Sequence, residues 1–169
     1  MKLLWLACLA LSAQTLRVSG NFPADLYGSE DNRPACWGRA ESAELPIKFN
    51  PPEGMKVRIL RIRGDLLSWP RVLASQPPVL PGRYAGVLVG FSTTGAQGSK
   101  QCDWCADNTL VYVQDGLHGG EVRHTVFDWD FLDTLPDATL ILKIASFLNT
   151  TGYPIHMEAT WQAQFEYVK

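Results

Sequence analysis

Residues 155–167, with the sequence IHMEATWQAQFEY, decide the fold. Every second residue of this stretch is apolar or aromatic, and the residues between them are polar. Successive side chains of a β-strand point to opposite faces, so the pattern predicts a strand with one buried face and one solvated face. Helical spacing would scatter the same residues around an axis. The apolar set is Ile155, Met157, Ala159, Trp161, Ala163, Phe165 and Tyr167.

The stretch before it, residues 139–148, is apolar on both faces and predicts a central strand of a sheet. Between the two strands, residues 149–152 read Asn-Thr-Thr-Gly. These are turn formers, and the glycine can adopt a positive φ. The sequence therefore predicts that the last two strands form a hairpin with a short loop.

The rest of the chain continues the β pattern, and no segment has a clear helical period. Short strands joined by Gly- and Pro-rich loops are typical of two packed antiparallel sheets. We expect an all-β chain that forms a single antiparallel β-sandwich of about seven strands, jelly-roll-like or related. The five further strands are expected at 44–50, 55–64, 84–93, 109–114 and 121–131.

Residues 55–64 contain a change of pattern. Met55, Val57 and Ile59 share one parity, whereas Leu60 and Ile62 share the other. Such a switch indicates a β-bulge or a strand that crosses between sheets, and a corner of the sandwich is the expected cause.

The N-terminus resembles an export signal. Lys2 precedes an apolar run that ends in small residues, and this run is too short to cross a bilayer as a helix. We expect a signal peptide within residues 1–20, cleaved near Ala13 or Gly20. An extended segment at 21–43 and the sandwich domain at 44–169 should follow. The protein is then secreted or periplasmic, with no stable membrane span.

The net charge of −2 excludes a strongly basic protein. Arg58, Arg61 and Arg63 alternate along one expected strand without a companion cluster, so nucleic acid is not an expected partner. Nothing in the sequence calls for a cofactor.

Removal of the leader leaves three cysteines, which is an odd number. In an oxidising compartment two of them should form a disulfide, and their spacing does not choose the pair. A redox dithiol and a zinc site are less favoured, because a thiolate-stabilising helix and a second close pair of ligands are both missing. The disulfide candidates are Cys36, Cys102 and Cys105.

Acidic residues gather near the end of the 121–131 strand. His124, Asp128 and Asp130 share one face, which makes them a weak alternative for a metal site, although no metal site is assigned. A solvated strand face is the more ordinary interpretation. A small secreted hydrolase is the alternative function, with Asp128, Asp130, Asp133 and Asp137 lining a cleft. No catalytic residue is assigned, and the sequence leans against an enzyme.

Aromatic residues in or beside loops are the candidate ligand-binding residues, because flat amphipathic rings stack on sugars. Two long loops, at 66–81 and 94–108, would form the contact surface. The sequence thus favours a secreted, non-enzymatic binding or interaction module whose unknown partner is a glycan or a protein. The aromatic candidates are Trp69, Tyr84, Trp104 and Tyr153.

Overall fold

The protein is all-β, as its sequence predicts. A computed structural model describes residues 15–28, 41–93 and 109–169. Within these ranges no helix is long and apolar enough to cross a membrane. Eight strands are present: β1 (Leu16–Leu26), β2 (Glu41–Lys48), β3 (Lys56–Pro70), β4 (Tyr84–Ser92), β5 (Thr109–His118), β6 (Arg123–Thr134), β7 (Thr139–Phe147) and β8 (Ile155–Val168).

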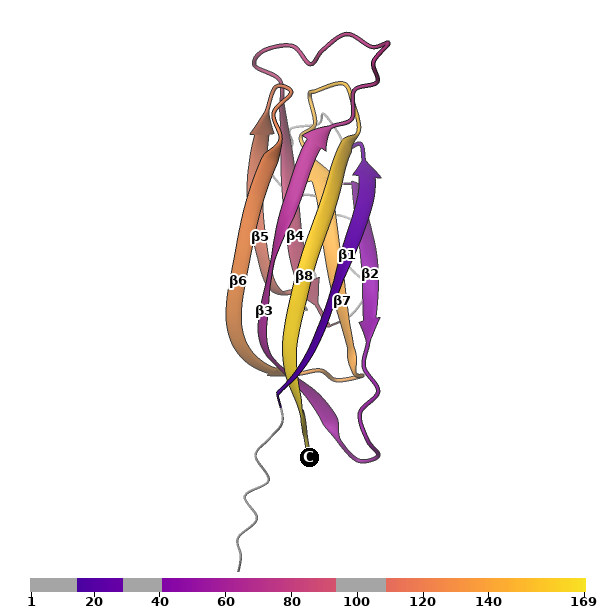
Figure 1. Cartoon of the computed structure of the whole chain (residues 1–169), viewed down its shortest axis with the longest axis vertical. Helices are drawn as coiled ribbons and strands as arrows, with labels where there is room; N and C mark the ends of the chain where they lie inside the picture. The colour runs from indigo at the N-terminus through magenta and orange to yellow at the C-terminus, as the bar shows by residue number, and fades with distance from the viewer. Residues whose placement is uncertain (1–14, 29–40, 94–108) are drawn as a thin grey trace, which may run out of the picture.

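The strands form two antiparallel sheets packed face to face (Figure 1). Sheet A has the order β1-β8-β3-β6, and sheet B has the order β2-β7-β4-β5. Each strand of the first half therefore pairs with one of the second half: β1 with β8, β2 with β7, β3 with β6 and β4 with β5. This is a long antiparallel ribbon rolled into a sandwich, which is the jelly-roll arrangement.

The last strand lines the interior, as its alternating pattern predicts. From Ile155 to Phe165 every second residue of β8 is buried, and Trp161 and Phe165 are only 4% and 7% exposed. They pack against Ile59 and Leu66 of β3 and against the inner face of sheet B. Burial of each large apolar side chain stabilises the fold by roughly 1.5–3 kcal/mol.

The predicted C-terminal hairpin is wrong. β7 lies in sheet B between β2 and β4, whereas β8 lies in sheet A between β1 and β3. The Asn-Thr-Thr-Gly turn is part of a connection that passes from one sheet to the other. β7 pairs instead with the distant strands β2 and β4, because local turn chemistry does not decide which strand lies beside it. The prediction that β7 is central is confirmed, because β7 lies between β2 and β4 in sheet B.

The switch of parity in β3 is a bulge. The register with β8 shifts between Ile59 and Arg61, so Leu60 is the extra residue. The predicted sandwich corner is wrong, because β3 stays in sheet A along its whole length. β3 also continues to Pro70, so residues 66–70 belong to the sheet and not to the loop that the prolines indicated.

The N-terminal region holds a strand that the sequence analysis did not predict. β1 pairs with β8 from Leu16 to Leu26, within the segments expected to be leader and extended arm. Its inward positions include Gly20 and Ala24, and it contains Pro23. These residues weaken the strand pattern, and proline and small residues are tolerated here because β1 is an edge strand.

Candidate functional site

The β3 bulge positions the arginines of sheet A. Ile59 and Ile62 are both fully buried, and the extra residue between them turns Arg61 and Arg63 to the outer face. Without it, Arg61 would share the inward parity of Ile59. The bulge therefore keeps these two guanidinium groups out of the core.

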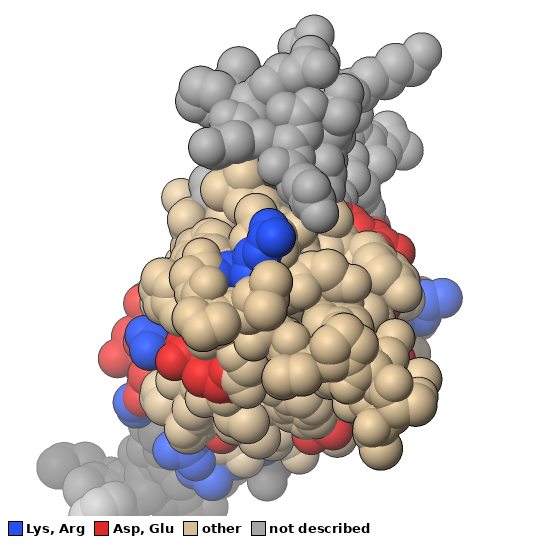
Figure 2. Space-filling model, turned by 90° about the horizontal axis from the view of Figure 1, so that it is seen from above, with Lys and Arg blue, Asp and Glu red and all other residues tan. Residues whose placement is uncertain are grey.

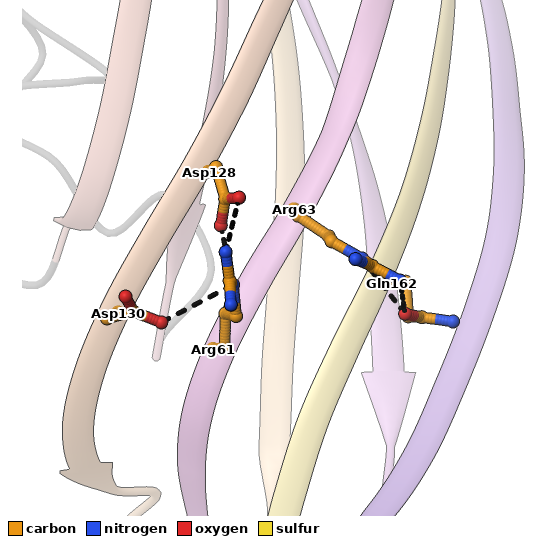
Figure 3. Close-up of polar contacts among 5 residues, drawn as sticks. All are labelled: Arg61, Arg63, Asp128, Asp130 and Gln162. Atoms are coloured by element: carbon orange, nitrogen blue, oxygen red, sulfur yellow. Dashed lines mark hydrogen bonds and ion pairs between the residues drawn. The ribbon is translucent and has the colours of Figure 1, made fainter.

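Arg61 is neutralised by two carboxylates from the neighbouring strand β6. Its Nε and Nη2 donate to the two oxygens of Asp128 at 2.7 and 2.6 Å, and Nε lies 3.4 Å from Asp130 (Figure 3). This fork-to-carboxylate geometry fixes the Asp128 side chain. The hydrogen bond from Arg61 is the main reason why the pKa of Asp128 lies below its usual value.

Arg63 has a different partner. Its Nε and Nη2 both donate to Oε1 of Gln162 on β8, at 3.1 and 2.8 Å. In Figure 3 the amide nitrogen of Gln162 points away from Arg63. Arg58 pairs with Glu166 at 3.1 Å and Arg61 pairs with Asp128, so Arg63 is the β3 arginine whose fork is held by a neutral group. Its charge also helps to lower the pKa of Asp128, but no carboxylate of the described residues forms an ion pair with it.

A shallow hollow of about 460 Å³ lies around these residues on the outer face of sheet A. All four strands of the sheet line it. The short side chains of Ser19 and Thr160 leave the space, and longer side chains border it. The polar lining residues are Ser19, Arg63, Asp65, Asp128, Thr160 and Gln162.

The hollow offers hydrogen-bond donors and acceptors in close succession. Arg63 and the Gln162 amide nitrogen donate, the carboxylates of Asp65 and Asp128 accept, and the two hydroxyls do both. Asp65 is held by His124, whose Nε2 lies 3.0 Å from Oδ2. Ion pairs and hydrogen bonds thus fix several of these groups before any ligand arrives, which lowers the entropic cost of binding.

The predicted aromatic residues do not line this hollow. The Trp69 ring packs at a tilt against His156, with ring centroids 4.5 Å apart, and the Tyr84 ring packs in the same way against His118 at 5.2 Å. The hydroxyl of Tyr153 donates to the carbonyl of Pro77 at 2.5 Å. Each of these three rings already has a partner within the protein. Trp104 lies outside the described residues.

The predicted acidic residues are not gathered into one site. Of Asp128, Asp130, Asp133 and Asp137, only Asp128 lines the hollow, and both Asp128 and Asp130 contact Arg61. His124 bonds to Asp65 and not to the carboxylates that share its face. Within residues 15–28, 41–93 and 109–169, no group of three or more His, Cys, Asp or Glu side chains could hold a metal ion.

The disulfide candidates Cys36, Cys102 and Cys105 lie outside the described residues.

The local sequence does not reveal the site, because its residues come from different strands. The sequence predicts that the polar residues of β8 face solvent and that Arg63 has no companion cluster. One pattern in the sequence links these residues: each occupies a position on its strand whose side chain points to the outer face of the sheet. The lateral order β1-β8-β3-β6, which makes them neighbours, is a product of the tertiary fold.

Comparison with known proteins gives no family. No protein-family model matches the chain, and no curated protein matches it. A solved structure of infectious bursal disease virus, Gx strain, is similar at a TM-score of 0.36 and 8% identity; the match covers 90% of this chain and 37% of that one. A turnip yellow mosaic virus structure is similar at a TM-score of 0.30 and 10% identity, covering 99% and 89%. This chain thus spans about 37% of the length of the bursal disease virus chain it matches.

Proposed function

We propose that this protein is a secreted, non-enzymatic binding module that holds a saccharide in the hollow on the outer face of sheet A. The observation that carries the proposal is the Arg63–Gln162 pair: the guanidinium donates two hydrogen bonds of 3.1 and 2.8 Å to a neutral amide at the edge of an open hollow, and no ion pair holds it among the described residues.

The chemistry of the lining supports a saccharide over an ion. Each sugar hydroxyl both donates and accepts a hydrogen bond, which suits a surface of alternating donors and acceptors. The lining carries both signs of charge, with Arg63 beside Asp65 and Asp128, so a simple anion and a simple cation would each meet a like charge. A neutral ligand with several hydroxyls meets neither penalty.

A hydrolase has less support. Hydrolysis of a glycosidic bond needs one carboxylic acid that is protonated at the working pH. Arg61 lowers the pKa of Asp128, the one acidic candidate in the hollow, so this group is ionised and cannot serve as that acid near neutral pH.

Export to an extracytoplasmic compartment is part of the proposal, and it rests on the leader-like residues 1–13. Extracytoplasmic fractionation of cells that express the full chain tests it. Retention of all the protein inside the cell would contradict export without bearing on the hollow.

The binding experiment is a glycan array with the purified protein, followed by titration of the best glycan. We expect Arg63→Ala to weaken binding about tenfold or more, because a charge-assisted hydrogen bond contributes about 1.5–3 kcal/mol. Thr160→Phe fills the hollow and should abolish binding. Both residues are exposed, so both variants should fold.

Arg58→Ala is the matched control. Arg58 lies on the same strand and also pairs across to β8, through Glu166, but it does not line the hollow. Its loss should leave glycan affinity unchanged. The proposal fails if no glycan binds, or if Arg63→Ala and Arg58→Ala bind alike.

A further inference from the structure

One end of the sandwich is capped by the loop of residues 71–83, which joins β3 to β4. In Figure 1 this loop passes over the top of the molecule. Viewed onto this end, most of the surface of the described residues is neither basic nor acidic (Figure 2). Three large apolar side chains near this end are strongly exposed: Leu73 at 57%, Leu80 at 60% and Tyr27 at 61%.

Hydrogen bonds at both ends of the loop and within it support its conformation. The amide of Arg71 donates to the Pro154 carbonyl at 2.8 Å, and the Arg83 carbonyl accepts from Gly119 at 2.7 Å. Within the loop, the amide of Leu73 donates to the Gln76 side chain at 2.8 Å, and the Gln76 amide donates back to the Leu73 carbonyl at 2.9 Å. Near Leu80, the Arg83 amide donates to the Leu80 carbonyl at 3.3 Å, so backbone hydrogen bonds support the loop beside both exposed leucines.

The charge of the loop has one sign. Residues 71–83 contain no Asp or Glu, and an arginine stands at each foot. Arg71 is paired with Asp25. Arg83 has no ion pair within the described parts of the chain, so its charge is available to a partner.

A loop that carries two exposed leucines between an arginine at each end has the two kinds of side chain that a membrane surface attracts. Leucine side chains favour the boundary of the acyl region, and arginine favours the level of the lipid phosphates. Leu73 and Leu80 are 57% and 60% exposed, so both side chains are accessible to an apolar surface. A protein partner would need a broad complementary surface of about 800 Å² on each side. A loop that stands above the sandwich inserts into a bilayer without such a surface.

We propose that the 71–83 loop docks the protein onto a lipid bilayer, with Leu73 and Leu80 inserted and Arg83 facing the phosphates. This membrane site is independent of the hollow on sheet A.

The test is co-sedimentation of the full chain with vesicles of phosphatidylcholine, with and without phosphatidylserine. The wild-type protein should sediment with both, and more strongly with the anionic vesicles. Leu73→Asp combined with Leu80→Asp should weaken binding to both by about a hundredfold or more, because each buried leucine contributes about a factor of ten or more. Arg83→Gln should remove only the preference for phosphatidylserine.

Leu132→Asp is the matched control, because Leu132 on β6 is 75% exposed but lies near the other end of the strand from the loop. It should bind vesicles as the wild type does, and so should Arg63→Ala. The proposal is overturned if the wild-type protein does not sediment with either vesicle, or if Leu132→Asp lowers binding as much as the double variant. It is equally overturned if the two loop leucines instead mediate a concentration-dependent dimer that ignores vesicles.

Discussion

Trp161 is the largest side chain of the inner face of β8, and glycines flank it on both neighbouring strands. Gly20 of β1 and Gly64 of β3 are its register partners. A Cβ on Gly20 would lie 2.9 Å from the indole ring. A Cβ on Gly64 would lie 2.0 Å from the Thr160 carbonyl oxygen and 2.7 Å from the Phe127 ring. The missing side chain of Gly20 therefore leaves room for the indole ring, and that of Gly64 lets β3 approach the backbone of β8 closely.

Gly64→Ala should destabilise the protein strongly. The nearest atom to the added methyl is a backbone oxygen, which cannot rotate away, so the strands must separate. We expect a loss of about 3 kcal/mol in the free energy of unfolding, measured by urea denaturation. Gly120→Ala is the control, since a Cβ there meets nothing within 4 Å. Equal stabilities of the two variants would contradict this account of the Trp161 site.

Asn149 organises the connection between the two sheets. It is 5% exposed, and its Nδ2 donates to the carbonyls of Tyr27 and Tyr153. Its Oδ1 accepts from the Thr151 amide at 3.0 Å and from the Thr151 hydroxyl at 2.6 Å. Asn149-Thr150-Thr151 has the form of a glycosylation acceptor, but a glycan on Nδ2 would replace one of these donors in the folded protein.

Asn149→Ala should lower the free energy of unfolding by about 2–4 kcal/mol, because it leaves buried backbone groups without partners. Asn50→Ala provides the comparison at an exposed asparagine. Its effect should stay within about 0.5 kcal/mol. Chemical denaturation of both variants measures the difference, and similar losses would show that the Asn149 network is not stabilising.

At the scale of the element, β1 determines where the folded domain begins. Leu16 and Val18 are half-buried against the core, and Leu16–Gly20 pair with Trp161–Phe165 of β8. Cleavage after Ala13 would leave this strand whole, whereas cleavage after Gly20 would remove its first half.

Deletion of residues 1–13 should therefore leave stability unchanged, and deletion of residues 1–20 should lower it by roughly 2–4 kcal/mol. Thermal or urea unfolding of the two truncated proteins measures this difference. N-terminal sequencing of exported protein should begin at Gln14. A fully stable protein that begins at Asn21 would show that the first half of β1 is dispensable.

At the scale of the whole molecule, three carboxylates make the free energy of unfolding depend on pH in the acid range. The hydrogen bond with His156 lowers the pKa of Asp25, and the hydrogen bond from Arg61 lowers that of Asp128. Burial, the largest single effect on Asp115, acts to raise its pKa. Hydrogen bonds from Arg123, Thr125 and the Gly116 amide together outweigh it. All three pKa values lie below the ordinary 3.8 in the folded state.

A carboxylate with a lowered folded pKa contributes stability above its unfolded pKa and loses it as the pH falls through the folded value. The free energy of unfolding should therefore be flat above pH about 5 and fall below pH about 4. Asp115→Asn should reduce stability at pH 7 and make this fall shallower. Asp137→Asn, at an exposed turn carboxylate, should do neither. Unfolding curves measured from pH 7 to pH 2.5 test both, and an unchanged slope for Asp115→Asn would contradict the assignment.

The sequence by itself determined the class of fold and the interior of one sheet. The alternation in residues 155–167 was enough because a period of two can bury only one face of a strand, whatever its neighbours are. The apolar run of β7 likewise predicted a central strand. The parity switch after Ile59 predicted an irregularity there, but the structure was needed to choose a bulge over a crossing between sheets.

Only the tertiary structure decided which strands are neighbours. Backbone hydrogen bonds are the same for any pair of strands, so local pattern could not show that β7 and β8 lie in different sheets or that β1 belongs to the sandwich. The hollow depends on that lateral order, because Ser19, Arg63, Asp128 and Gln162 come from four strands. The sequence specifies the side chains of these residues, but only the pairing of strands in the folded sandwich brings them together.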